Sequence, residues 1–282
     1  MVSASSFVIT GASTGIGRAC VDELVSAGAQ VWATVRADAD ELALKQAHGD
    51  AVRVLRMDLS DAESISRAGQ LVCEAGPLHG LVNNAGVALP GPLEYLPLDV
   101  FRRQIEVNLT GQLAVTQAML PALRKARERG EQARIVMVGS ISGRIATPMH
   151  GAYTVSKFGL VGLADTLRAE LAPAGIGVVL IEPGRIATPI WDRGIAAGDH
   201  LLARLGEAQK SVYAAQISAA QADAAGARAK GLPPEQAARV IVRALTGRNP
   251  RPRQLIGADA RLAAAVTMLP FRLRYRLTAA RR

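Results

Sequence analysis

The sequence has 282 residues, of which 49% are hydrophobic, and a formal net charge of +9 at pH 7. This length favours one large α/β domain over two small ones, and the hydrophobic content is ample for a single buried core. Cys20 and Cys73 lie in predicted helices beside apolar neighbours, which argues against a disulfide and against a metal site. We find neither a signal-peptide pattern nor an apolar run of about 18 residues, so we expect a cytoplasmic protein.

The glycine-rich stretch that follows the first predicted strand indicates a dinucleotide site. An apolar strand at residues 7–10 runs into Gly11, Gly15 and Gly17, and a helical pattern follows at residues 18–27. Glycine lets the backbone turn sharply and approach a pyrophosphate, whose charge is met by the free N–H groups at the helix N-terminus. A flexible turn would also explain the glycines, but their place directly after the first strand favours cofactor binding.

The end of the second predicted strand carries information on the cofactor. This strand covers residues 31–35 and is followed by Arg36. At this place in a dinucleotide fold, an acidic residue accepts from the ribose 2′-hydroxyl of NAD, whereas an arginine accommodates the 2′-phosphate of NADP. The sequence therefore favours NADP over NAD. The alternative interpretation of Arg36 is a solvated surface side chain.

Further apolar strands alternate with helical patterns, which predicts a doubly wound, Rossmann-type parallel sheet covered on both faces. We expect helices at residues 61–75, with Ser60 as N-cap, and at residues 98–129, with Asn108 in the interior. Asparagine is a poor interior helix residue, so Asn108 indicates either a structural kink or a functional role. The other predicted elements are strands at 52–57, 81–82, 135–139, 177–181 and 254–257 and helices at 153–171 and 234–246.

Three side chains near the fifth strand suggest acid-base chemistry. Tyr153 and Lys157 are four residues apart in a predicted helix, which places them on one face, and Ser140 follows the strand at residues 135–139. A nearby cation favours the phenolate and moves the tyrosine pKa toward neutrality. The serine hydroxyl could hold a carbonyl oxygen beside the tyrosine. Taken alone, the pair could equally be a solvated helix pair.

The last third of the chain departs from the strand and helix alternation. Residues 190–231 are rich in alanine and too long for a simple connection, so we predict one or two helices over the site whose apolar residues face a substrate. The alternative is that these residues pack only on the body of the domain. We place the folded domain, with this substrate loop, at residues 1–259.

The positive charge is concentrated toward the C-terminus. Residues 226–282 contain 13 Lys and Arg against two acidic residues, a net charge of +11, and the other 225 residues carry 20 basic and 22 acidic side chains. We predict a basic C-terminal tail at residues 260–282 that is solvated, packs on a partner subunit or lies on an anionic membrane. The tail has no nucleic-acid-binding motif, so we expect no nucleic acid and at most weak membrane-surface contact.

The motifs together resemble those of the short-chain dehydrogenases/reductases over about two thirds of the chain, residues 2–188. Any one of them could arise by chance, but their order and spacing match the family. The strand end at Arg36 and the run from Glu182 to Pro189 look most like the retinol and hydroxysteroid dehydrogenase-like branch. The matching motifs are Thr10-Gly11-x-x-x-Gly15-x-Gly17, Asn83-Asn84-Ala85-Gly86, Asn108, Ser140, Tyr153-x-x-x-Lys157 and Pro183-Gly184.

The resemblance implies a role for each matching residue. Tyr153 would be the proton donor or acceptor, and Lys157 would bind the nicotinamide ribose and lower the tyrosine pKa. Ser140 would orient the substrate oxygen, and Asn108 would hold a water that connects Lys157 to solvent. The remaining residues would bind the cofactor: Gly11, Ser13, Gly15, Ile16 and Gly17 at the pyrophosphate, Asp58 and Leu59 near the adenine, Asn84 along the cofactor, and Pro183, Gly184, Ile186 and Thr188 at the carboxamide side.

The resemblance also implies an activity. We expect an NADP-preferring oxidoreductase that interconverts a hydrophobic alcohol and its ketone or aldehyde, working as a homodimer or homotetramer. An alternative of a different class is a sensor or scaffold protein that binds NADP in the same fold without turnover. The sequence does not identify the substrate or the direction of the reaction.

Overall fold

The computed structural model describes residues 5–279, apart from the side chains of residues 275 and 277–279. Within these residues seven parallel strands form one sheet in the order β3-β2-β1-β4-β5-β6-β7. The predicted Rossmann-type sheet is therefore confirmed. The strands are β1 (Ser6–Ile9), β2 (Gln30–Val35), β3 (Val52–Arg56), β4 (Gly80–Asn83), β5 (Arg134–Val138), β6 (Gly177–Pro183) and β7 (Arg253–Ile256).

Helices cover both faces of the sheet. Two large groups of buried apolar side chains form the core, one on each face: α3, α5 and α6 contribute to one, and α1, α2 and α10 contribute to the other. The helices are α1 (Gly15–Ser26), α2 (Asp38–His48), α3 (Ala62–Ala75), α4 (Leu98–Ile105), α5 (Gly111–Glu128), α6 (Gly151–Leu171), α7 (Ile190–Leu202), α8 (Glu207–Val212), α9 (Ala214–Lys230), α10 (Pro234–Thr246), α11 (Ala258–Val266) and α12 (Phe271–Ala279), with short 3-10 turns at Gly49–Ala51 (η1), Ile141–Gly143 (η3) and Ala172–Ala174 (η4).

Two details of the helices differ from the sequence prediction. Asp61, not Ser60, caps α3, because its side chain accepts from the N–H groups of Glu63 and Ser64, while the Ser60 hydroxyl donates to Asp58. The single helix predicted at residues 98–129 is divided into α4 and α5 by a π-helical turn, η2 (Glu106–Thr110), which contains Asn108. Such turns insert one extra residue into a helix and occur often at functional sites.

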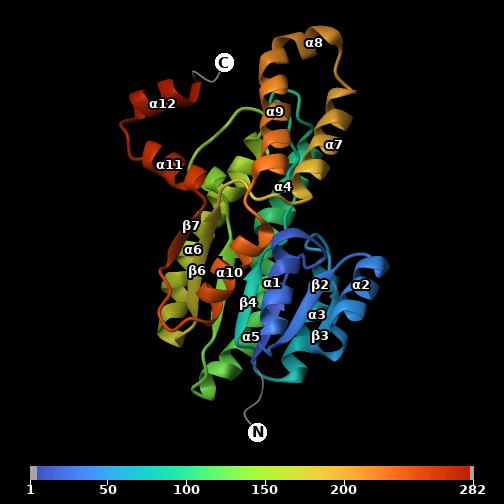
Figure 1. The fold of residues 1–282 in the computed structure, drawn as a ribbon, viewed down its shortest axis with the longest axis vertical. Helices are drawn as coiled ribbons and strands as arrows, with labels where there is room; N and C mark the ends of the chain where they lie inside the picture. Colours follow the sequence, from blue (N-terminus) through green and yellow to red (C-terminus); the bar gives the residue numbers. More distant parts are fainter. Residues whose placement is uncertain (1–4, 280–282) are drawn as a thin grey trace.

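Five helices that follow β6 or β7 extend beyond the sheet at one end. Figure 1 shows α7, α8 and α9 on one side of this end and α11 and α12 on the other, opposite the N-terminus. The segment 190–231 forms three helices where one or two were predicted, since Glu207–Val212 is helical as well. Within residues 5–279 we find no helix with the length and apolar character needed to cross a membrane.

Candidate active site

A cavity of about 1080 Å³ lies at the carboxyl ends of the strands. Ligands of open α/β sheets bind at this edge, where the strand order reverses between β1 and β4. The predicted site residues line the cavity, except Gly17 and Asn108, which lie behind its wall. Those that line it are Gly11, Ser13, Gly15, Ile16, Arg36, Asp58, Leu59, Asn84, Ser140, Tyr153, Lys157, Pro183, Gly184, Ile186 and Thr188.

The glycine-rich turn after β1 has the shape that a pyrophosphate requires. Gly11 adopts φ +65°, a conformation that favours glycine. A Cβ on Gly17 would lie 2.6 Å from Asn84 Nδ2 and even closer to the Gly11 carbonyl oxygen, so the turn closes tightly on the start of α1. Thr14 is the N-cap of α1, and among the described residues its side chain caps none of the first N–H groups. These groups are therefore available to an anion, and the turn fits a dinucleotide.

Thr10, the first residue of the glycine-rich motif, joins this turn to β4. Thr10 Oγ1 accepts from the N–H groups of Asn84 (2.8 Å) and Ala85 (2.9 Å) and donates to the Val82 carbonyl (3.2 Å). The Asn84 amide donates in return to the carbonyls of Thr10 (2.9 Å) and Gly11 (3.3 Å). Asn84 therefore fixes the glycine-rich turn as well as lining the cavity.

At the end of β2, Arg36 lies beside Asp58. The guanidinium is 3.9 Å from the Asp58 carboxylate, and the Arg36 side chain is 59% exposed. Partial burial pulls the pKa of Asp58 upward, but hydrogen bonds with Ser60 and the charges of Arg103 and Arg36 together bring it below its usual value. Asp58 is therefore ionised at neutral pH. Arg36 is free to face the cavity, because Asp58 engages it only loosely.

Ser140 lies at the start of η3, directly after β5. Its hydroxyl oxygen accepts from the Ser142 N–H (3.1 Å), which caps the turn and fixes the side chain at the cavity wall. The Gly143 N–H donates to the Ser140 carbonyl (2.9 Å) and closes the turn. The serine is thus held by its own backbone turn and can still donate its proton toward the cavity.

Tyr153 and Lys157 lie on one face of α6, as their spacing predicts. The Lys157 ammonium is 5.6 Å from the centroid of the Tyr153 ring and donates to the Val138 carbonyl (2.9 Å). Burial raises the pKa of Tyr153, and a hydrogen bond with Ser140 lowers it only in part. The sequence analysis expected Lys157 to lower the pKa of Tyr153. In the structure burial has the larger effect on this pKa. The Lys157 ammonium instead donates its hydrogen bond to the backbone carbonyl of Val138.

The pKa of Lys157 gives a test of its burial. Burial lowers this pKa from 10.5 to about 8, so between these values the unfolded chain binds more protons than the folded chain. Relative to Lys157→Met, the wild-type free energy of unfolding should therefore rise between pH 8 and 10, by at most about 1.4 kcal/mol per pH unit. Urea unfolding of both proteins without added cofactor measures the difference. A difference that stays constant over this range would show that the ammonium is not desolvated.

The π-helical turn places Asn108 against the loop after β4. Its Oδ1 accepts from the Val87 N–H (2.9 Å), and its Nδ2 donates to the Val87 carbonyl (3.0 Å) and to Ser156 Oγ (3.1 Å). Ser156 belongs to the same helix as Tyr153 and Lys157. Asn108 thus connects α6 to a loop that lines the cavity, and a water contact to Lys157 stays a prediction.

The loop after β6 is fixed by a residue that the sequence analysis did not place in the site. Asp259, in the first turn of α11, accepts from the Arg185 N–H (2.7 Å) and lines the cavity. Its carboxylate leaves no room for a Cβ on Gly184. The signal was weak, because a single aspartate after the last strand has many possible partners.

The helices of residues 190–231 form a lid on the cavity. Arg193 of α7 donates to Thr14 Oγ1 (3.3 Å) beside the glycine-rich turn, and Arg185 pairs with Asp223 of α9. The apolar side chains expected to face a substrate do line the cavity. From α7 and α9 they are Ile190, Trp191, Ile195, Leu202, Ile217, Ala219, Ala220 and Ala224.

The predicted tail begins as part of this site. Ala260 and Ala264 of α11 are buried, and Leu262, Ala263 and Val266 line the cavity opposite the lid. The sequence analysis placed this stretch in a basic C-terminal tail and did not connect it to the cavity. A site role for residues 262–266 was therefore missed, although the alanine-rich pattern allowed a helix.

A sequence model of the short chain dehydrogenase family matches residues 6–197, more than half of the chain. The chain belongs to the short-chain dehydrogenase family. The matched stretch contains the glycine-rich turn, Ser140, Tyr153 and Lys157. It ends within α7, so the rest of the lid, β7 and α11 lie outside it.

Two characterised proteins and one solved structure show how far the similarity to other short-chain dehydrogenases extends. A 3-amino-tetrahydro-pyrrolizinone reductase of Xenorhabdus hominickii is 34% identical over 261 residues, which are 91% of this chain and 88% of the relative. Human retinol dehydrogenase 5 is 34% identical over 273 residues, 90% of this chain and 81% of the relative. A short chain dehydrogenase/reductase of Burkholderia phymatum, solved in complex with NAD, has a TM-score of 0.76 and 26% identity, and the match covers 93% of this chain and 91% of that one.

These findings confirm the family, its retinol dehydrogenase-like branch and the fold that the sequence predicted. The predicted class of activity, NAD(P)-dependent oxidoreduction, is confirmed with them. They give no support to a sensor or scaffold without turnover.

Proposed function

We propose that this short-chain dehydrogenase interconverts a hydrophobic alcohol and its ketone or aldehyde, with Tyr153 as the acid-base residue and NADP as the preferred cofactor. One observation supports this most strongly: Ser140, Tyr153 and Lys157 line the same cavity as the glycine-rich turn and Arg36. When bound, the nicotinamide supplies or takes up the hydride. The protein then has to orient the two reactants and move one proton.

The residues of the site divide this work. In reduction, the Tyr153 hydroxyl gives its proton to the substrate oxygen, while the Ser140 hydroxyl donates a hydrogen bond to the same oxygen. Lys157 would hold the nicotinamide ribose, and its positive charge would stabilise the phenolate left behind. In oxidation the phenolate takes the proton back. Lys157 is buried and Tyr153 is half-buried in the cavity wall, which limits the access of water to this exchange.

The preference for NADP rests on Arg36. Its guanidinium lies at the end of β2, beside the position that the adenosine ribose takes in this fold, and it lines the cavity. Asp58 cannot serve as the sole partner of the ribose hydroxyls, because Arg103 and Arg36 both face its carboxylate. Arg36 therefore offers a cation to a 2′-phosphate, while Asp40 and Asp58 are acidic residues in the lining of the same cavity.

Arg36→Ala should separate the two cofactors. Because a hydrogen bond to a charged group is worth about 1.5–3 kcal/mol, we expect the Kd for NADP to rise roughly 10- to 100-fold and that for NAD to stay within about threefold. Fluorescence titration with both reduced cofactors measures this. Arg67→Ala, which removes the same charge from the exposed surface of α3, is the control. Equal losses for NADP and NAD would rule out the 2′-phosphate contact.

The substrate class follows from the other half of the cavity. Apolar residues of the lid face apolar residues of α11 across the space beside Tyr153, and Ile141 and Ile145 line it next to Ser140. Such a lining favours a bulky apolar alcohol or carbonyl compound. Retinol dehydrogenase 5, a relative by sequence, is named for a substrate of this kind.

A panel experiment tests the proposed function as a whole. Steroids, retinoids, acyl ketones and sugars are incubated with the protein and either nicotinamide, and cofactor consumption is followed by absorbance. We expect turnover with apolar alcohols or ketones, faster with NADP(H), and none with sugars. Tight NADP binding without turnover of any compound would instead support the sensor alternative.

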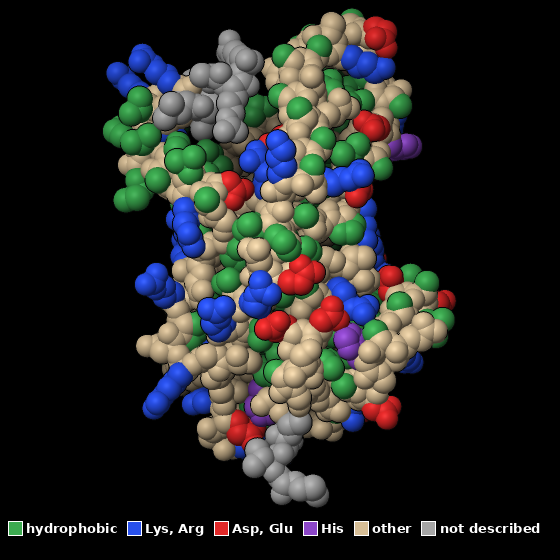
Figure 2. Space-filling view, viewed as in Figure 1, with side chains coloured by type: hydrophobic (Ala, Val, Ile, Leu, Met, Phe, Trp, Pro, Cys, Tyr) green, Lys and Arg blue, Asp and Glu red, His purple; other side chains and the backbone are tan. Residues whose placement is uncertain are grey.

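Three further expectations stay predictions. The cytoplasmic location and assembly as a homodimer or homotetramer are consistent with the family but follow from it only by analogy. The third is weak membrane-surface contact through the C-terminal residues. Figure 2 shows hydrophobic and basic side chains together over α11 and α12, and Leu262, Met268 and Phe271 are 71%, 88% and 69% exposed.

A further inference from the structure

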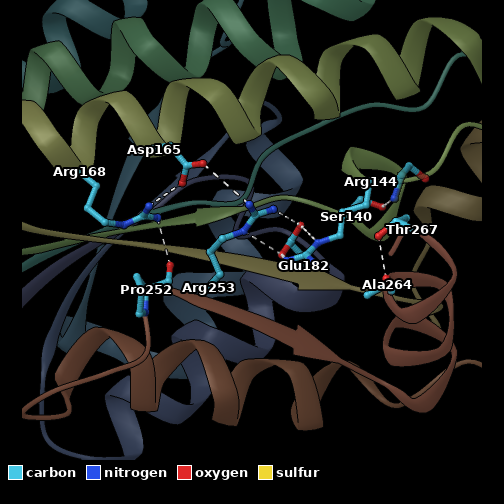
Figure 3. Close-up of polar contacts among 10 residues, drawn as sticks. Ser140, Arg144, Asp165, Arg168, Glu182, Pro252, Arg253, Ala264 and Thr267 are labelled. Atoms are coloured by element: carbon cyan, nitrogen blue, oxygen red, sulfur yellow. Dashed lines mark hydrogen bonds and ion pairs between the residues drawn. The ribbon is translucent and has the colours of Figure 1, made fainter. Parts of the chain in front are cut away.

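A buried carboxylate near the end of β6 is bound by two arginines. Glu182, the penultimate residue of β6, is fully buried, and its side chain lies between Arg144 and Arg253 (Figure 3). Arg144 Nε donates to Oε1 (2.7 Å) and its Nη2 donates to Oε2, while Arg253 Nη2 donates to Oε1 (2.8 Å). Both oxygens of the carboxylate are thus satisfied by charged donors. A buried carboxylate requires such pairing, because its desolvation is costly.

Arg144 connects this carboxylate to the turn that carries Ser140. It directly follows η3, and its N–H donates to the Ile141 carbonyl (2.9 Å), so Ser140 stands at one end of the turn and Arg144 at the other. The turn also packs closely on α6, since a Cβ on Gly143 would lie 2.9 Å from the Lys157 carbonyl oxygen. A shift of Arg144 would therefore move the turn relative to α6.

Glu182 also connects the turn to the loop on the cofactor side. It is followed by Pro183 and Gly184, which line the cavity, and the Gly139 N–H donates to the Ile181 carbonyl (2.7 Å) where β5 and β6 end side by side. The ion pair therefore connects the ends of two adjacent strands. β5 leads to Ser140, and β6 leads to the loop that contains Pro183 and Gly184. The two partners of the ion pair are 38 residues apart in the sequence.

We propose that Arg144 and Glu182 are positioning residues that fix the Ser140 turn against the loop after β6, so that the serine hydroxyl meets the substrate oxygen beside Tyr153. Neither residue touches a reacting atom. The proposal rests on the proposed function of Ser140 and Tyr153. A bidentate pair suits this task, because its two parallel hydrogen bonds fix orientation as well as distance.

Arg144→Gln tests the proposal. A misplacement of about 1 Å can cost up to about 100-fold, so we expect kcat to fall roughly 10- to 100-fold while the Kd for NADPH changes by less than about twofold. Because the hydrogen bond with Ser140 lowers the pKa of Tyr153, the pH profile of kcat should also shift to higher pH. Arg144→Lys, which keeps the charge but loses the bidentate geometry, should restore part of the rate.

A double-mutant cycle distinguishes positioning from general stability. If Arg144 acts through Ser140, Arg144→Gln should slow the Ser140→Ala protein by no more than about threefold. A loss of the same factor in both backgrounds would overturn the proposal. Melting temperatures of all variants ensure that kinetics are measured on folded protein.

Asp165→Asn is the matched control within the same network. Asp165 is 3.8 Å from Arg253 and 2.5 Å from Arg168, on the side away from Ser140 (Figure 3). We expect kcat within about twofold of wild type, since exposed pairs are worth little. A loss equal to that of Arg144→Gln would show that the network acts only on stability.

The same assays on Tyr153→Phe separate the positioning role from the proposed function. If Tyr153→Phe keeps full turnover, the proposed function fails. If Tyr153→Phe is inactive and the kcat of Arg144→Gln equals that of Asp165→Asn, only the positioning role fails.

Discussion

Tyr153→Phe should lower kcat by a factor of about 10² to 10⁴, the range that general acid-base catalysis contributes. The substitution removes one oxygen atom and keeps the ring, which lies 5.6 Å from the Lys157 ammonium. The Kd for NADPH should therefore stay close to that of wild type. Stopped-flow measurement of a single turnover with saturating cofactor and a substrate from the panel gives the chemical rate directly.

The control for this prediction is Tyr95→Phe. The ring of Tyr95 lies edge-on against Tyr213, 5.9 Å between centroids, where α8 ends and α9 begins. Removal of its hydroxyl keeps that ring contact, so we expect kcat within about twofold of wild type. If Tyr153→Phe retained more than a tenth of the wild-type single-turnover rate, another group would have to move the proton.

The fold was predictable because its strands are local apolar runs that end in recognisable turns. β1 and β5 each carry a short run of Val, Ile, Met or Phe, followed by glycine or serine at the cavity edge. A parallel sheet is covered by helices on both faces, so the alternation of strands and helices in the sequence predicts a parallel sheet. The start of α3 was misplaced by one residue, since Ser60 and Asp61 are both good caps and only the folded backbone decides between them.

The candidate site was predictable where its residues are close in sequence or follow a strand. Tyr153 and Lys157 are one helical turn apart, so they lie on one face of the helix. The position of Ser140 follows from the end of β5. The site residues that were missed depend on contacts between distant segments, such as Asp259 with the Arg185 N–H, 74 residues apart. No periodic pattern encodes such a contact.

The pKa of Tyr153 shows the same limit. The sequence indicated the sign that a neighbouring cation gives, but the burial of the phenol depends on the whole cavity wall and outweighs it. Burial also affects Lys157, whose ammonium is directed to the Val138 carbonyl. Charge spacing can be read from a sequence, whereas desolvation can be read only from the packed structure.

Gly17→Ala is the second large effect that we expect, and it concerns cofactor affinity. The added methyl group would lie 2.6 Å from Asn84 Nδ2 and 2.9 Å from the Gly11 carbonyl carbon. Neither neighbour can move freely, because the Asn84 amide bonds to the carbonyls of Thr10 and Gly11. The turn would have to open, and overpacking of about 1–3 kcal/mol corresponds to a roughly 5- to 150-fold higher Kd for NADPH.

Gly162→Ala provides the comparison, because a Cβ there would meet no described atom within 4 Å. It lies inside α6, where alanine is the better helix former, so its Kd for NADPH should equal that of wild type. Fluorescence titration of NADPH measures both variants, and circular dichroism shows whether each is folded. An unchanged Kd for folded Gly17→Ala would mean that the start of α1 does not approach the pyrophosphate, because the only chemical change is a methyl group directed at the turn that holds it.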